Sequence, residues 1–149
     1  MKGFPDLPPI WWFASIGIIY LAKYIAPAWH FETALLNTLS WGMLGAALVI
    51  LCWSAVWFFR KKTPIEPHHS PTDLIVEGPY RVSRNPIYLA LVMLTLASAM
   101  GHGSVVGLIM AVVLWLILDR RFAAPEEDGL RDAFGDAAEQ YFKQTRRWL

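Results

Sequence analysis

Residues 85–118 read NPIYLALVMLTLASAMGHGSVVGLIMAVVLWLIL, and these 34 residues decide the fold because none of them carries a formal charge. A single helix of that length would measure about 51 Å, against a hydrocarbon core of roughly 30 Å. Near the middle stands Gly101-His102-Gly103, where two helix-weakening glycines flank a polar side chain. The stretch therefore predicts a helical hairpin with arms near residues 86–100 and 104–119. Each arm is short for a full crossing, which leaves open whether the hairpin passes through the whole bilayer.

Two more apolar runs precede the hairpin. Residues 7–30 carry one formal charge, Lys23, and residues 33–59 carry none. Each run is long enough for one transmembrane helix, near residues 8–26 and 38–59. The first run has only one lysine in its flank, Lys2, and a Trp-rich centre, and no small-residue cleavage site follows it, so a cleaved signal peptide is not expected. We therefore expect an all-α membrane protein with about four transmembrane helices in a single domain, residues 1–149.

The composition agrees with this class. Hydrophobic residues make up 56% of the chain and charged residues 17%, whereas soluble domains have about 45–50% and about 25%. Such apolar content excludes a disordered chain, and a net charge of +1 argues against a nucleic-acid partner. Cys52 is the single cysteine, and no second ligand cluster accompanies His68-His69. We therefore expect neither an intrachain disulfide nor a metal site.

The Lys and Arg residues predict an orientation. Twelve of the 13 fall in the N-terminus, in the connector at residues 60–85 or in the tail from residue 119 onward, and the loop at 26–38 has none. Positive charge marks the cytoplasmic side of a membrane protein. With four crossings, both termini, the connector and the tail are expected on the cytoplasmic face of a bacterial inner membrane. Lys23, near the outer end of the first helix, can reach the interface by snorkelling.

The two polar segments predict different structures. Four prolines between residues 64 and 79 indicate that the cytoplasmic connector is extended rather than helical. The tail has apolar residues at helical spacing and predicts an amphipathic C-terminal helix over 125–146, with Pro125 in its first turn. Glu126 and Glu127 suit the positive end of such a helix. Taken alone, this dipole matching is a sufficient structural explanation for the acidic pair.

Two charged clusters should meet at the cytoplasmic ends of the hairpin. The first is LIVEGPYRVSRNPIY, residues 74–88, and the second is Glu126-Glu127, followed by Leu130 and Phe134-Gly135. The hairpin runs out and back, so the clusters at its two ends come close together. A cation-rich turn that faces a carboxylate pair suits a small zwitterionic or cationic ligand.

The first cluster closely resembles the Gly-Pro-Tyr … Arg-His/Asn-Pro-x-Tyr motif of the isoprenylcysteine carboxyl methyltransferase and phospholipid methyltransferase superfamily. The tail is similar to that superfamily's Glu-Glu-x-x-Leu … Phe-Gly … Tyr … Arg-Arg-Trp ending, here closing on Arg146, Arg147 and Trp148. The resemblance covers residues 63–149. It implies an integral membrane enzyme that uses S-adenosylmethionine without a Rossmann domain and methylates a lipophilic or lipid acceptor at the cytoplasmic face. A carboxylate, an amine or a thiol remains open as the acceptor, and so does the oligomeric state.

The resemblance also implies roles for particular residues. Arg84 matches the arginine at the junction of cofactor and substrate, and with Glu127 it forms the expected catalytic pair. Asn85 stands where the eukaryotic enzymes have histidine, and an amide cannot shuttle protons near neutral pH. Ala90 and Ala138 replace a glycine and a tyrosine of the usual pattern. The residues expected to bind the cofactor are Leu74, Ile75, Val76, Gly78, Tyr80, Asn85, Tyr88, Glu126 and Glu127.

Simpler explanations exist for the same residues. Tyr80 and Tyr88 could be interface anchors, Arg84 a positive-inside charge, and Asn85-Pro86 a plain helix start. The alternative to an enzyme is a non-catalytic small membrane protein or a four-helix exporter. An exporter would need an ionisable residue deep within a membrane helix, and Lys23 and Glu32 lie near the outer boundary. A non-catalytic protein would not need Tyr, Arg and Glu together in this order.

Overall fold

The computed structural model describes residues 6–31, 33–61 and 74–149. The prediction of an all-helical chain is confirmed for these residues, which form isolated β-bridges but no strand. Glu32, His68-His69 and three of the connector prolines lie outside the described residues. The helices are α1 (Pro8–Ile25), η1 (Pro27–Trp29), α2 (Ala34–Lys61), η2 (Gly78–Arg81), α3 (Pro86–Gly101), α4 (Val105–Leu118), the π-helical η3 (Asp119–Ala123), α5 (Ala124–Phe134) and α6 (Asp136–Gln144).

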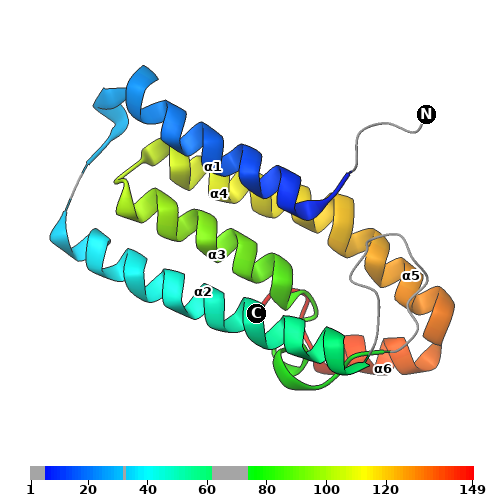
Figure 1. Ribbon diagram of the computed structural model, residues 1–149. Helices are drawn as coiled ribbons and strands as arrows, with labels where there is room; N and C mark the ends of the chain where they lie inside the picture. The colour runs from blue at the N-terminus through cyan, green and yellow to red at the C-terminus, as the bar shows by residue number, and fades with distance from the viewer. Residues whose placement is uncertain (1–5, 32, 62–73) are drawn as a thin grey trace.

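Helices α1 to α4 lie side by side with alternating direction, and the chain reverses at both ends of the group (Figure 1). Residues 26–31 and 102–104 lie together at one end, which we call the tip end. Residues 78–85 and 119–148, which include α5 and α6, lie at the other end, which we call the tail end. The two charged clusters of the sequence are therefore at the same end of the molecule, as the hairpin predicted.

The tip end is closed by backbone contacts. Phe31 N donates to Gly103 O over 2.8 Å, so the link after α1 is tied to the hairpin turn. Gly103 has φ +56°, and a Cβ at this position would collide with the Phe31 carbonyl. Only glycine satisfies both the turn and this close approach. The side chain of Ser104 then caps the start of α4. The hairpin turn thus falls at 102–104, within one residue of the predicted position.

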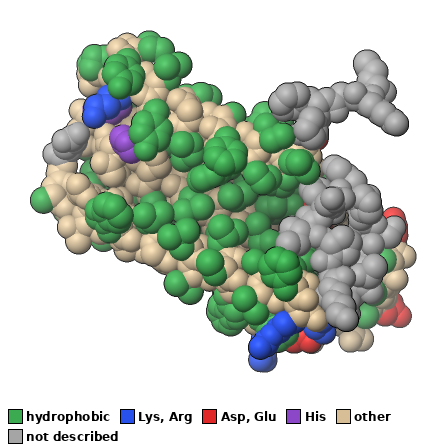
Figure 2. Space-filling model, viewed as in Figure 1, with side chains coloured by type: hydrophobic (Ala, Val, Ile, Leu, Met, Phe, Trp, Pro, Cys, Tyr) green, Lys and Arg blue, Asp and Glu red, His purple; other side chains and the backbone are tan. Residues whose placement is uncertain are grey.

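Helix α2 has the length and hydropathy to cross a membrane. It has 28 residues, and an 18-residue stretch within it has a mean hydropathy of 2.0. A helix of 28 residues is about 42 Å long. Large apolar side chains along it, such as Leu39, Val49 and Phe59, are exposed, and Figure 2 shows hydrophobic side chains spread over the helices while the acidic side chains in view gather at the tail end. Helices α1, α3 and α4 measure only about 27, 24 and 21 Å. The count of four transmembrane spans stays a prediction.

The predicted helix start at Pro125 is wrong. Ala123 has helical φ and ψ, so α4, the π-helical η3 and α5 run on as one continuous helix. Pro125 has no N–H and its ring crowds the carbonyl four residues earlier, which is Arg121. The wider π turn of η3 accommodates this proline. Because no free helix N-terminus exists at 125, matching of a helix dipole does not explain why Glu126 and Glu127 are there.

The single C-terminal helix expected over 125–146 is instead two helices. Gly135 has φ +50°, a conformation that favours glycine, and separates α5 from α6. Arg131 on α5 spans the break, because its guanidinium contacts Glu139 on α6 at 2.8 Å. The break turns α6 back, so that Tyr141 is buried and donates to the Tyr80 carbonyl over 2.7 Å.

A hydrophobic core supports the tail end. It joins α3, α4 and η3, and its members are Tyr88, Leu91, Leu114, Leu118, Phe122 and Ala123. Trp12 from α1 and Trp148 from the C-terminal segment pack against this core. The charged side chains of the tail end are therefore attached to a rigid base of packed helices.

Candidate active site

Glu127 is buried between two arginines at the tail end. Its side chain is 3% exposed, and Arg147 binds both of its carboxylate oxygens, with Nε and Nη2 each at 2.8 Å. Arg84 contacts the same carboxylate through Nη2, at 3.2 Å from Oε1. A buried carboxylate requires such partners, because burial without them would cost several kcal/mol. The predicted pair of Arg84 and Glu127 is thus in direct contact.

The Arg84 guanidinium is held in place by an aromatic ring and is incompletely paired. Its Cζ lies 4.5 Å from the centre of the Phe142 ring on α6, an arrangement that favours a cation. Its Nε is buried and has no hydrogen-bond partner among the described residues. Burial lowers the pKa of Arg84, while Glu127 opposes this shift. One buried donor of Arg84 is therefore unpaired among the described residues.

Glu126 faces a different part of the site. Successive residues of a helix point about 100° apart, and Glu126 therefore turns from Glu127 toward α3, where the Tyr88 hydroxyl donates to its Oε1. Burial raises the pKa of Glu126 to about 7; the Tyr88 hydrogen bond opposes this shift and the Glu127 charge adds to it. The two adjacent carboxylates thus differ: Glu127 is locked between arginines, and Glu126 exchanges its proton near neutral pH.

The C-terminal segment closes over the connector. Arg84 N donates to the Arg146 carbonyl over 2.9 Å. The Arg147 carbonyl accepts from Ser83 Oγ at 3.1 Å and from Asn85 Nδ2 at 3.3 Å. Asn85 precedes α3 without a side-chain capping bond, so the plain helix-cap explanation for Asn85 is wrong. Its amide instead ties residues 145–148 to the connector.

The remaining predicted residues surround η2. Gly78 has φ +60°, and a Cβ there would collide with the Trp57 ring of α2, so this turn requires glycine. Tyr80 is buried against Phe58, with ring centres 5.8 Å apart, and burial together with nearby Tyr141 and Glu126 raises its pKa. Ile75 is buried and Val76 is exposed, but no polar contact joins residues 74–76 to the Arg84–Glu127 pair in the described chain.

Sequence reasoning did not identify two groups of this site. Asp119 contacts Arg147 Nη1 at 3.2 Å and accepts from Trp148 Nε1 at 2.8 Å. It is the first charged residue after the uncharged stretch 85–118, a signal that could have been used. Phe142, which stacks on Arg84, carries no motif signal. The described residues contain no cluster of His, Cys, Asp and Glu suited to a metal ion.

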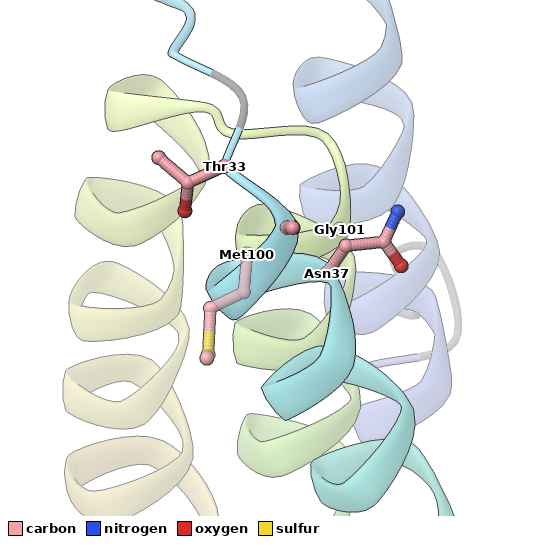
Figure 3. A pocket seen from close by; sticks show the side chains of 5 residues that line it. Thr33, Asn37, Met100 and Gly101 are labelled. Carbon is pink, nitrogen blue, oxygen red and sulfur yellow. The ribbon is translucent and has the colours of Figure 1, made fainter.

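A separate cavity of about 260 Å³ lies at the tip end, between the start of α2 and the end of α3. Figure 3 shows the side chains around it, which come from Thr33, Ala34, Asn37, Met100 and Gly101. None of these side chains is charged at neutral pH, so they cannot balance the charge of a zwitterionic or cationic ligand. The candidate active site is therefore the charged cluster at the tail end.

The sequence model of one family, described as phospholipid methyltransferase, matches residues 42–137, more than half of the chain. The matched region contains both charged clusters and ends before Tyr141 and the Arg146-Arg147-Trp148 ending. No curated protein and no solved structure matches the chain. The resemblance noted from the motifs is thereby confirmed.

Proposed function

Because the chain belongs to the phospholipid methyltransferase family, we propose that it transfers a methyl group from S-adenosylmethionine to a lipophilic acceptor at the cytoplasmic face of the membrane. The observation that carries this proposal is the buried Glu127 between Arg84 and Arg147, beside the Tyr88–Glu126 pair. A purely structural charge cluster would be expected to pair every buried donor. Here Arg84 Nε is left without a partner among the described residues.

The residues of the tail end fit a zwitterionic cofactor. A buried unpaired donor is costly, so a ligand carboxylate at Arg84 Nε would be favourable. Glu126 can accept a hydrogen bond from a ligand ammonium once it is ionised, and the Tyr88 hydroxyl orients it. The other proposed cofactor contacts are Leu74, Ile75, Val76, Gly78, Tyr80, Asn85 and Glu127.

The chain's part in the reaction is chiefly positioning. When bound, S-adenosylmethionine supplies a methyl group on a positively charged sulfonium, which is transferred by in-line displacement. Arg84 and Glu127 are the proposed catalytic pair, with Arg84 orienting the ligand and Glu127 orienting Arg84. A carboxylate or thiolate acceptor would need no base, whereas Glu126 could take the proton from an amine. The acceptor would enter from the bilayer between the helices.

Cofactor binding by the purified protein is the direct test. Calorimetric titration in detergent with S-adenosylhomocysteine should give saturable binding, and membranes incubated with methyl-labelled S-adenosylmethionine should yield a labelled lipophilic product. Identification of that product would name the acceptor. Absence of binding and of labelled product would favour a non-catalytic membrane protein or an exporter.

The orientation has its own test. We propose that both termini lie on the cytoplasmic side of a bacterial inner membrane, because the cationic segments that the structure describes, namely the end of α2, η2 and residues 119–147, lie at the tail end. In a Cys52→Ser background, His102→Cys at the tip end should react with an impermeant thiol reagent added from outside. Reaction from the cytoplasmic side alone would reverse the proposed orientation.

A further inference from the structure

Arg147 forms hydrogen bonds through both its side chain and its main-chain carbonyl, unlike a solvent-exposed surface arginine. Its guanidinium spans Glu127 on α5 and Asp119 on η3, while its carbonyl accepts from Ser83 and Asn85 of the connector. Trp148 also binds Asp119, through Nε1 at 2.8 Å. Both ends of this residue, side chain and main chain, are therefore attached to the elements that form the candidate site.

The two arginines share Glu127 unequally. Arg147 forms a two-pronged pair with the carboxylate, one nitrogen to each oxygen at 2.8 Å. Arg84 has a single contact with it, at 3.2 Å from Nη2, and its Nε is buried and unpaired among the described residues. A planar guanidinium prefers to pair two of its nitrogens with one carboxylate. Arg84 lacks that arrangement: Arg147 binds both oxygens, and Arg84 shares one of them, Oε1, with Arg147.

We infer that Arg147 is a positioning residue, which engages Glu127 so that Arg84 keeps a free N–H for the carboxylate of the methyl donor. This inference rests on the proposed function. Without the Arg147 guanidinium, both Glu127 oxygens become available to Arg84. Arg84 then forms its own two-pronged pair with Glu127, and its charge and donors are used within the protein. The site loses its preference for an anionic group on the ligand, although its shape is kept.

Two ligands that differ only in that group provide the test. S-adenosylmethionine has the carboxylate and decarboxylated S-adenosylmethionine lacks it. Calorimetric titration of the full-length protein in detergent should show that the wild type binds the carboxylated form at least about tenfold more tightly, as expected for a hydrogen bond between charged groups. In Arg147→Gln this ratio should fall to near one, through weaker binding of the carboxylated form only.

The matched control is Arg146→Gln. It removes the same charge from the adjacent position, where the side chain is exposed and contacts only the Leu149 carbonyl among the described residues, at 3.4 Å. The wild-type ratio should persist in this variant. If Arg147→Gln does not fold, Arg147→Lys retains the charge but cannot engage both oxygens, and its ratio should fall at least about threefold.

The possible results separate the two proposals. If the wild type binds neither ligand, the proposed function fails. If the wild type binds both ligands equally, cofactor binding stands and the assignment of the carboxylate to Arg84 is overturned. If Arg147→Gln weakens both ligands by the same factor, or retains the wild-type ratio, Arg147 is only structural and the inference is overturned. A retained ratio in Arg147→Lys, when this is the variant that folds, overturns it as well.

Discussion

Both ends of the helical group are closed by hydrogen bonds to the main chain but, in the part of the chain that the structure describes, only the tail end adds buried ion pairs to them. At the tip end, a backbone hydrogen bond between Phe31 and Gly103 closes the turn, and its cavity is lined by uncharged residues. At the tail end, hydrogen bonds to the main chain, such as that from Arg84 N to the Arg146 carbonyl, are accompanied by ion pairs that join Glu127 and Asp119 to Arg84 and Arg147. Buried ion pairs contribute little net stability, and the proposed function gives those of the tail end a role in ligand binding.

The largest effect is expected from Glu127→Gln. Two arginines would lose their carboxylate, and breaking a buried pair costs about 3–5 kcal/mol. The lower value is the better expectation, because the Arg147 side chain is 32% exposed. Thermal unfolding in detergent measures this loss, and calorimetry should show weakened cofactor binding. Asp128→Asn is the control: its side chain is 74% exposed and pairs with Arg131. Equal stability and affinity in the two variants would remove Glu127 from the site.

The pH dependence of stability should distinguish Glu126 from Glu127. The pKa of Glu126 is raised from 4.5 to about 7 in the folded protein, so between these values the folded state binds more protons than the unfolded state. The unfolding free energy therefore falls by on the order of 3 kcal/mol as pH rises through this window. It stays level above about pH 7. Glu126→Gln should remove this fall. Parallel stability curves for wild type and variant would show that Glu126 titrates normally.

A substitution at the tip end should affect stability without affecting binding. Gly103→Ala introduces a side chain at positive φ against the Phe31 carbonyl, a strain of about 1–3 kcal/mol. Thermal stability should fall while cofactor affinity stays at the wild-type value. Gly129→Ala is the matched control, because open space surrounds this α5 position, and it should be neutral or slightly stabilising. Weaker cofactor binding in Gly103→Ala would show that the two ends are coupled.

The smallest expected effect in free energy comes from Arg84→Lys. Lysine keeps the charge but loses the planar guanidinium that stacks on Phe142 and pairs with carboxylates. Turnover should fall by at least about tenfold, which corresponds to about 1.4 kcal/mol in the barrier. Arg81→Lys, three residues earlier on an exposed side chain, should keep wild-type turnover. Wild-type activity in both variants would show that Arg84 serves only as one of the positive charges that orient the protein in the membrane.

Local features of the fold follow from the sequence. The uncharged stretch 85–118 with its two central glycines predicted the hairpin. This was possible because the length of an uncharged run and the helix-weakening effect of glycine are properties of the local sequence. The proximity of the two charged clusters was also expected, since a hairpin brings its two ends together; the structure adds the direct contact between Arg84 and Glu127. The prediction of a helix start at Pro125 was wrong, because η3 absorbs the proline within a continuous helix.

The different partners of the two carboxylates, Glu126 and Glu127, were decided by the tertiary structure. From sequence, Glu126 and Glu127 were both expected to bind the cofactor and Glu127 also to be catalytic, with dipole matching at a helix start as the alternative explanation for both. The reversal at Gly135 brings Arg147 back to Glu127, twenty residues away along the chain. Helical rotation meanwhile directs Glu126 to Tyr88 on another helix. Charge and helical periodicity are readable in the chain itself, but the partner of each charge depends on contacts between segments that only the folded chain brings together.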